Sequence, residues 1–176
     1  MPSPFYRPPF SIVRDTRENT PWPFTGLFHG SGKQLQPILV ELSDKTLATG
    51  DYSLVGHELD ISIERKSLPD LFNCCGGDRK RFEEQVRRLN ETIAIPYLIV
   101  EGDWMMIERW RGPGAHPSSV IGTRISWEQK YPKVKWMFLP SAAVAQRVAF
   151  RIFERFYSLR GMQSGQAEQS EQVATD

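Results

Sequence analysis

Hydrophobic and polar positions along residues 11–160 repeat with two different periods. Segments that alternate every second residue, or that are apolar throughout, predict β-strands at residues 10–13, 37–42, 51–55, 59–65, 95–100 and 134–139. Segments with apolar residues three and four positions apart predict helices at residues 78–92, 117–130 and 141–161. A run of strands followed by alternating helices and strands predicts an α/β domain. We expect its mixed central sheet to be flanked by helices, with an antiparallel front part and a crossover-connected rear part.

The helix predicted at residues 141–161 has an unusually wide apolar face. One stripe consists of Val144, Val148, Ile152, Phe156 and Leu159, and the stripe beside it of Ala145, Ala149, Phe153 and Tyr157. A single core contact does not need a face this wide. Two interpretations remain open: the helix is wedged deep in its own domain, or part of the face is a dimer interface.

The composition is that of one globular domain between two polar or extended ends. The chain has 176 residues, of which 40% are hydrophobic and 24% charged. We expect a Pro-rich extended arm at residues 1–10, the domain at 11–160 and a disordered tail at 161–176. The tail carries three acidic residues and no basic one, so residues 1–160 have a formal charge of +4 against +1 for the whole chain. This mild basic bias permits a nucleic-acid partner without establishing one.

Several classes of protein are excluded. No apolar run is long enough to span a membrane, and the first residues lack the pattern of a secretory signal. Cys74 and Cys75 are adjacent, which excludes a disulfide framework and a C-x-x-C zinc site and suits a reducing compartment such as the cytoplasm. Lys33 follows a glycine as in a phosphate-binding loop, but the rest of that motif is missing.

The residues that suggest chemistry lie around the strand predicted at residues 59–65. The two-residue period of Ile61-Ser62-Ile63-Glu64-Arg65-Lys66 places Glu64 and Lys66 on one face of this strand. A hairpin back to the preceding strand can bring Asp51 beside Glu64. Two carboxylates are suitable ligands for Mg²⁺ or Mn²⁺, which lowers the pKa of a bound water. The ammonium of Lys66 can orient or deprotonate that water, or neutralise developing charge, and this combination fits phosphodiester hydrolysis.

Charged residues on a strand are more often only a solvated face. The spacing Gly-Asp-x₁₂-Glu-Arg-Lys-x₃-Asp, from Gly50 to Asp70, favours a functional site, because several fixed residue types at such tight spacing rarely coincide. The runs GDY and ERKSLPDL resemble the signature of the XPF-type structure-specific DNA endonucleases, a branch of the PD-(D/E)XK nuclease superfamily. Three further segments are similar to this family: residues 12–18 with Asp15, Arg17 and Glu18; Arg81-Phe82-x-x-Gln85; and the apolar strand ending in Glu101. The resemblance covers residues 11–102.

The resemblance implies a restriction-endonuclease-like fold and a metal-dependent DNA endonuclease. In this family's pattern Asp51 and Glu64 hold Mg²⁺ or Mn²⁺, and Lys66 acts on the nucleophilic water. The site is completed by Asp15, Arg17, Arg65 and Asp70. The implied substrate is branched, flap or fork-type DNA in repair, recombination or replication, and the implied assembly is a homodimer or heterodimer through the nuclease domain. We expect a compact bacterial or phage-type member acting in the cytoplasm.

Two alternatives accompany this interpretation. The family includes catalytically inactive subunits that bind only DNA or a partner, although the presence of Asp51, Glu64, Lys66 and Asp70 favours an enzyme. The second alternative concerns the predicted helix at residues 78–92. We expect DNA phosphates to bind to its basic residues and their neighbour, namely Arg79, Lys80, Arg81, Gln85 and Arg88. The alternative is a solvated basic face whose charges are paired with Glu83 and Glu84.

Overall fold

The computed structural model describes residues 3–173, with side chains as far as Gly161. Its centre is a six-stranded sheet in the order β4-β1-β5-β6-β7-β8. The strands are β1 (Ile12–Arg14), β4 (Leu42–Asp44), β5 (Tyr52–Leu54), β6 (Ile61–Ser67), β7 (Ile95–Glu101) and β8 (Lys135–Leu139). Strand β5 is antiparallel to β1 and β6, whereas β7 and β8 continue parallel to β6. The predicted mixed sheet with a parallel rear is therefore confirmed, and its front is antiparallel except at the edge, where β4 is parallel to β1.

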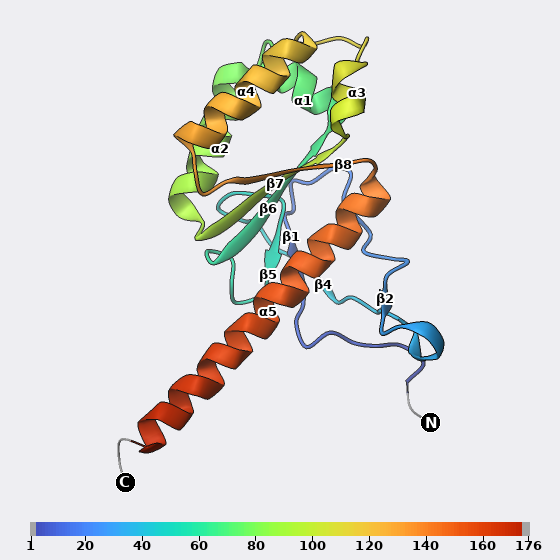
Figure 1. The fold of residues 1–176 in the computed structure, drawn as a ribbon, viewed down its shortest axis with the longest axis vertical. Helices are drawn as coiled ribbons and strands as arrows, with labels where there is room; N and C mark the ends of the chain where they lie inside the picture. Colours follow the sequence, from blue (N-terminus) through green and yellow to red (C-terminus); the bar gives the residue numbers. More distant parts are fainter. Residues whose placement is uncertain (1–2, 174–176) are drawn as a thin grey trace.

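Helices cover both faces of this sheet (Figure 1). They are α1 (Leu68–Cys75), α2 (Arg79–Thr92), α3 (Trp104–Glu108), α4 (Pro117–Lys130) and α5 (Ala142–Val173). A small ribbon of β2 (Phe28–His29) and β3 (Gln36–Pro37) encloses a 3₁₀ turn, η1 (Gly32–Gln34). One core lies between the sheet and α1, α2 and α4, and a second core lies between the sheet and α5. The sheet is thus buried from both sides, and β6 lies in its middle.

Helix α1 begins directly after β6, with no residue between the two elements. The Oγ of Ser67 accepts a hydrogen bond from the backbone N–H of Asp70 at 3.3 Å, which caps the first turn. Pro69 stands in that turn, where a backbone N–H is not needed. The end of β6 is therefore held in place by both the sheet and a helix.

Three elements differ from the prediction. No continuous strand covers residues 37–42, because the backbone of Ile38 and Leu39 bonds to Leu27 and Tyr6 instead of joining the sheet. Helices α1 and α3 were not predicted. The adjacent Cys74 and Cys75 end α1. Cys75 is buried, and both cysteines are free thiols.

Helix α5 does not end at Gly161 as predicted but continues to Val173. Glycine costs a helix only about 1 kcal/mol relative to alanine, and the alanine, glutamine and glutamate residues that follow are good helix formers. The helix thus enters the segment predicted as a disordered tail, whose residues 174–176 lie outside the described part. No helix of the described residues is long and apolar enough to cross a membrane.

The wide apolar face of α5 is partly packed in the domain's own core and partly open, so each of the two interpretations, core helix and dimer interface, applies to one part of it. Ala145, Ala149 and Phe153 of one stripe are fully buried in the core against the sheet. In the other stripe Val148 and Ile152 are only half-buried, and Leu159 is 44% exposed. One stripe belongs to the domain's own core, and the other is left partly open.

Candidate active site

A cleft of about 500 Å³ lies where β1 and β6 end and β5 begins, beside the first turns of α1 and α2. It contains most of the residues selected from the sequence. These are Asp15, Arg17, Asp51, Glu64, Arg65, Lys66, Asp70, Arg81, Gln85 and Arg88. Arg79 and Lys80 do not line it.

Asp51 is held beside β6 by the turn that precedes it. Gly50 adopts a φ of +84°, and a Cβ at this position would lie 2.0 Å from the Oγ of Ser62, so the turn requires glycine. The backbone N–H of Asp51 donates to the carbonyl of Ile63 at 2.8 Å. Its Oδ2 accepts a hydrogen bond from the backbone N–H of Arg65 at 2.7 Å. The carboxylate is therefore fixed at the level of Glu64, on the neighbouring strand.

Glu64 is only 2% exposed and is incompletely hydrogen-bonded. Its Oε1 accepts from Nε2 of Gln85 at 2.7 Å and lies 3.1 Å from Nζ of Lys66. Its Oε2 is buried and has no hydrogen-bond partner among the residues that the structure describes. Burial raises the pKa of Glu64, and burial together with the charge of Glu64 raises the pKa of Asp51. Two neighbouring acids that are costly to ionise, one with an unused oxygen, form a donor set that a divalent cation fits.

Among the described residues, no three His, Cys, Asp or Glu side chains are grouped as a metal cluster. A cation in this cleft would therefore depend on Asp51 and Glu64. Both offer carboxylate oxygens, the ligand type that Mg²⁺ and Mn²⁺ prefer.

Lys66 lies on the same face of β6 as Glu64, as the two-residue period predicted. Its Nζ is 5.3 Å from the ring centre of Phe82. Burial lowers the pKa of Lys66, but the negative charges near it, that of Glu64 foremost, raise it above its ordinary value. In the cation-free protein Lys66 is therefore an ammonium, which suits neutralising charge or orienting a water.

Asp15 forms part of the cleft wall, and both of its oxygens are engaged. It is 3% exposed and accepts four hydrogen bonds, three from Arg17 and one from the backbone N–H of Leu47. Burial raises the pKa of Asp15, but these bonds, those of Arg17 foremost, lower it further, so the net shift is downward. The side chain of Arg17 is 64% exposed and faces the cleft. Asp15 thus positions a basic side chain at the cleft.

Arg65 points away from Glu64, to the other face of β6. Its Nε and Nη2 bind both oxygens of Glu101 at 2.8 and 2.9 Å. Its Nη1 donates to Oγ1 of Thr20 at 2.7 Å and lies 3.4 Å from Oε1 of Glu18. The guanidinium therefore joins β6 to β7 and to the loop after β1, and its backbone N–H holds Asp51.

Sequence patterns alone do not reveal the residues that complete this cluster. Nε1 of Trp22 donates to Oε1 of Glu101 at 2.6 Å, and the backbone N–H of Trp22 donates to the hydroxyl of Tyr52 at 2.7 Å. The rings of Trp22 and Tyr52 are stacked with their centres 4.8 Å apart. Glu101 was matched to a family pattern, but no role was assigned to it. No local pattern could have paired Trp22 with Glu101, since 79 residues separate them.

Asp70 lies at the rim of the cleft, in the first turn of α1. It is exposed, and its Oδ2 accepts a hydrogen bond from the Oγ of Ser67 at 2.6 Å.

Helix α2 divides the predicted DNA-binding residues into two groups. Arg81 and Arg88 are exposed, line the cleft and form no hydrogen bond or ion pair with any described residue. Gln85 lies between them and donates to Glu64, so its amide supports the carboxylate instead of standing free for DNA. DNA binding by Gln85 stays a prediction, and the structure gives its amide a bond to Glu64 as well.

Arg79 and Lys80 lie away from this cleft. The guanidinium of Arg79 is 5.1 Å from the ring centre of Trp127 and donates to Thr123, which ties α2 to α4. Lys80 lines a separate hollow with Glu83 and Glu84. Helical spacing alone could not separate Arg79 and Lys80 from Arg81, because the three residues are consecutive.

The alternative of a self-paired basic face is not what the structure shows. Glu83 bonds to Lys130 and Tyr131, and Glu84 pairs with Arg87. Neither forms an ion pair with Arg81 or Arg88. Both arginines remain available at the cleft.

Comparison with known proteins identifies the family of this chain. The sequence model of the ERCC4 domain matches residues 15–149. The chain belongs to the ERCC4 domain family. The 3'-flap repair endonuclease Xpf of Saccharolobus solfataricus is 36% identical over 105 residues, which are 57% of this chain and 42% of that protein.

Two solved structures share the fold. XPF from Aeropyrum pernix matches with a TM-score of 0.59 and 22% identity over 86% of this chain and 61% of that one. The complex of XPF from Aeropyrum pernix with DNA matches with a TM-score of 0.62 and 22% identity, over 86% and 66%. The predicted restriction-endonuclease-like fold is thereby confirmed. This ERCC4 domain protein spans less than half of the curated relative and under two thirds of these solved chains.

Proposed function

We propose that this ERCC4 domain protein is a Mg²⁺- or Mn²⁺-dependent endonuclease that hydrolyses phosphodiester bonds in branched, flap or fork-type DNA. The observation that carries the proposal is the buried, unpartnered Oε2 of Glu64, beside Asp51 in a cleft edged by Arg81 and Arg88. Membership of the ERCC4 domain family and the likeness to a 3'-flap repair endonuclease support it. A role in DNA repair or recombination follows from the same likeness.

Asp51 and Glu64 would hold the cation. When bound, such an ion lowers the pKa of a coordinated water and stabilises negative charge on the phosphate. Gln85 donates to Glu64 Oε1 and so sets the direction of the free oxygen, Oε2. Lys66 lies 3.1 Å from the same Oε1 and places its positive charge at the cleft, where it can orient the attacking water or neutralise the phosphate in the transition state.

Binding of the DNA backbone is assigned to the exposed cations around the cleft. Arg81 and Arg88 on α2 and Arg17 after β1 surround the carboxylates from two sides. Such contacts with phosphate oxygens position a duplex without reading its sequence. That fits an enzyme selecting the shape of DNA.

We also propose that Asp15, Arg65 and Asp70 act by positioning. Asp15 holds Arg17, and Asp70 accepts from Ser67 at the cap of α1. Arg65 holds Asp51 through its backbone N–H. None of the three needs to touch the reacting phosphate to matter for cleavage.

Assembly and location belong to the same proposal. A homodimer or heterodimer through this domain is supported by membership of the family, and the partly open stripe of α5 fits the heterodimer better than the homodimer. Action in the cytoplasm is supported by the free thiols of Cys74 and Cys75. Sedimentation velocity over a range of concentrations distinguishes a homodimer from a monomer.

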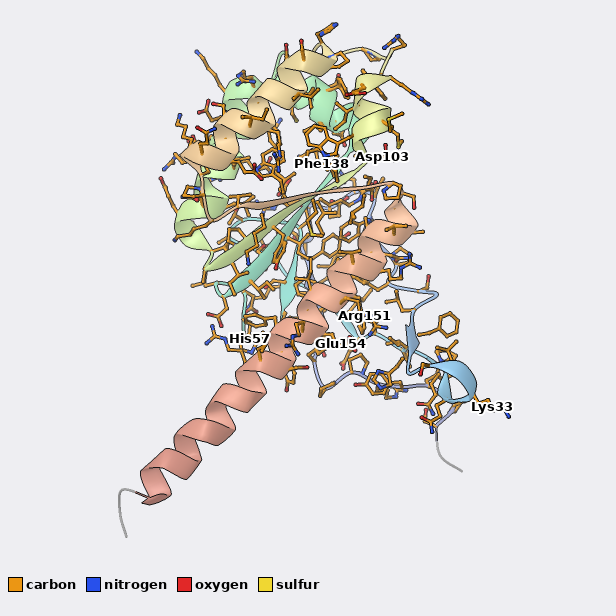
Figure 2. All side chains as sticks on the ribbon, in the orientation of Figure 1. Lys33, His57, Asp103, Phe138, Arg151 and Glu154 are labelled. Atoms are coloured by element: carbon orange, nitrogen blue, oxygen red, sulfur yellow. The ribbon has the colours of Figure 1, made fainter. Side chains whose placement is uncertain are left out.

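The deciding experiment incubates the purified chain with Mg²⁺ or Mn²⁺ and labelled fork, flap, junction, duplex and single-strand DNA. We expect cleavage near junctions that disappears in Asp51→Asn. Asp103→Asn is the matched control, because Asp103 caps α3 (Figure 2), does not line the cleft, and can be replaced as a cap by asparagine. Full activity in Asp51→Asn would refute the site. If the protein binds DNA but cleaves none of these substrates with either metal ion, the result would instead favour an inactive DNA-binding subunit.

A further inference from the structure

We propose that the groove between α5 and the sheet binds an acidic amphipathic helix of a different protein. The groove has a volume of about 540 Å³. Its floor is formed by apolar residues at the beginning of the parallel strands and by the partly open stripe of α5. This proposal does not depend on the nuclease activity.

The groove is separate from the catalytic cleft. Ile61 at the start of β6 and Ile95 at the start of β7 form its floor, whereas Glu64 and Lys66 lie nearer the other end of β6. Five residues of strand between Ile61 and Lys66 correspond to about 16 Å. The two sites also use opposite faces of the sheet, since Ile61 packs in the core under α5 and Lys66 faces Phe82 of α2. DNA bound at the cleft would leave the groove open.

Two parallel rows of side chains along α5 shape the groove. The apolar row is Val148, Ile152, Phe156 and Leu159, and the basic row is Arg147, Arg151 and Arg155. Each row advances by three or four residues and so stays on one side of the helix. The apolar row extends over about 16 Å, three turns of helix. A second helix with anchors at positions i, i+4 and i+7 matches this length, whereas a compact small molecule would not use all of it.

The charges around the groove have one sign. Lys135 of β8 stands with the arginine row, and none of the described residues that line the groove is acidic. Arg147 and Arg155 are exposed and form no hydrogen bond or ion pair with any described residue. Arg151 bonds to Glu154 and to the carbonyl of Phe28, and Figure 2 shows Arg151 and Glu154 together on α5. An occupant with carboxylates beside its apolar row would pair with these free cations.

A second copy of this chain is the less suitable occupant. In a two-fold symmetric dimer each copy presents the same patch, so the arginine rows and Lys135 of both copies would meet. Like charges placed together at an interface cost several kcal/mol. The charge pattern therefore favours a heterologous partner with acidic flanks over self-association through this face.

The test uses two labelled helical peptides of the same length, with leucines at the same three- and four-residue spacing. Glutamates flank the leucines in one, and lysines replace these glutamates in the other. We expect fluorescence anisotropy to give at least about tenfold tighter binding of the glutamate peptide, with the difference shrinking as salt rises. Adding Mg²⁺ and a fork DNA should leave this binding unchanged, because the cleft is elsewhere.

Charge reversal sharpens the test. Arg147→Glu with Arg155→Glu should reverse the preference so that the lysine peptide binds better. The matched control, Lys33→Glu with Lys133→Glu, changes the same net charge at exposed positions outside the groove and should leave the preference intact. Leu159→Ala should weaken the binding of both peptides by a similar factor, about fivefold. Circular dichroism of each variant checks that the fold is retained.

Three results would overturn the proposal. One is equal affinity for both peptides or no binding of either. Another is an unchanged preference in the charge-reversed variant. The third is a concentration-dependent dimer that Leu159→Asp dissociates, since this would make a second copy the occupant.

Discussion

Two buried carboxylates of the same cleft have opposite pKa shifts. Asp15 and Glu64 are only 3% and 2% exposed, although Glu64 lies deeper in the protein. The pKa of Asp15 is lowered because Arg17 and the backbone of Leu47 supply hydrogen bonds that outweigh burial. The pKa of Glu64 is raised because burial outweighs its bonds to Lys66 and Gln85, which reach only one of its oxygens.

The difference separates a structural acid from one kept free for a ligand. A buried carboxylate with every acceptor engaged stabilises its ionised form and the loops that donate to it. A buried carboxylate with an unused oxygen destabilises the folded protein until a positively charged ligand binds to it. Glu64 bears this cost together with Asp51, whose pKa is also raised.

The largest expected effect is that of Glu64→Gln. This change keeps the shape but removes the negative charge, and we expect cleavage to fall on the order of 10³-fold, as when a group stabilising transition-state charge is lost. The cation-free protein should be as stable as the wild type or more stable, because the buried charge is gone. Cleavage assays and urea denaturation measure the two effects. Glu91→Gln, at an exposed position on α2, is the control, and comparable activity in the two variants would contradict the assignment.

Asp15→Asn should act in the opposite way. We expect a loss of about 2 kcal/mol at neutral pH, chiefly from the buried N–H of Leu47, since the ion pair with exposed Arg17 is weak. Cleavage should fall less than in Glu64→Gln, because neither oxygen of Asp15 is free. Asp44→Asn, at an exposed ion pair, should change stability little.

The pH dependence of this loss is fixed by the direction of the pKa shift. A lowered pKa in the folded state gives stability that is present above the ordinary carboxyl pKa of about 4 and is lost as the pH falls through the folded value. The stability difference between wild type and Asp15→Asn should therefore shrink in acid. Urea denaturation across this range measures it, and a difference independent of pH would show that ionised Asp15 is not the cause.

Gln85→Leu tests whether α2 supports Glu64 or binds DNA at this position. Removing the amide leaves Glu64 Oε1 with Lys66 alone, and we expect kcat to fall by about 10- to 100-fold. The cation concentration needed for activity should rise, while DNA affinity stays the same. A weakened affinity with unchanged kcat would restore the role that the sequence predicted.

The smallest expected effect is that of Arg81→Ala with Arg88→Ala. Losing two phosphate contacts should lower the slope of log Kd against log salt by about two. Lys80→Ala with Lys133→Ala removes the same charge away from the cleft and should change the slope less. DNA titrations at several salt concentrations measure both slopes. Equal slopes in the two double variants would show that Arg81 and Arg88 contribute only their general positive charge and no specific phosphate contacts.

Periodicity predicted the part of the site that depends on one strand. The two-residue repeat of β6 placed Glu64 and Lys66 on one face, and the expected hairpin between β5 and β6 brought Asp51 beside Glu64. It also predicted the helix Pro117–Lys130 with the bounds found. These features are set by residues close together in sequence, so local rules were sufficient.

Contacts between distant segments could not be predicted. Helical spacing placed Arg81, Gln85 and Arg88 on one face, but only the packing of α2 against β6 decides that Gln85 points inward. In the same way, the alternation in residues 37–42 predicted a strand without saying whether a neighbouring strand would be free to pair with it. The backbone there bonds to the arm and to Leu27 instead.

The immediate passage from β6 into α1 makes the length of this segment critical. One residue inserted between Glu64 and Ser67 would turn every later side chain of the strand to the other face. The ammonium would then enter the aromatic core around Tyr52, and the helix cap would lose its register. Homologous sequences and engineered libraries should therefore accept no change in the number of residues between Ile61 and Leu68.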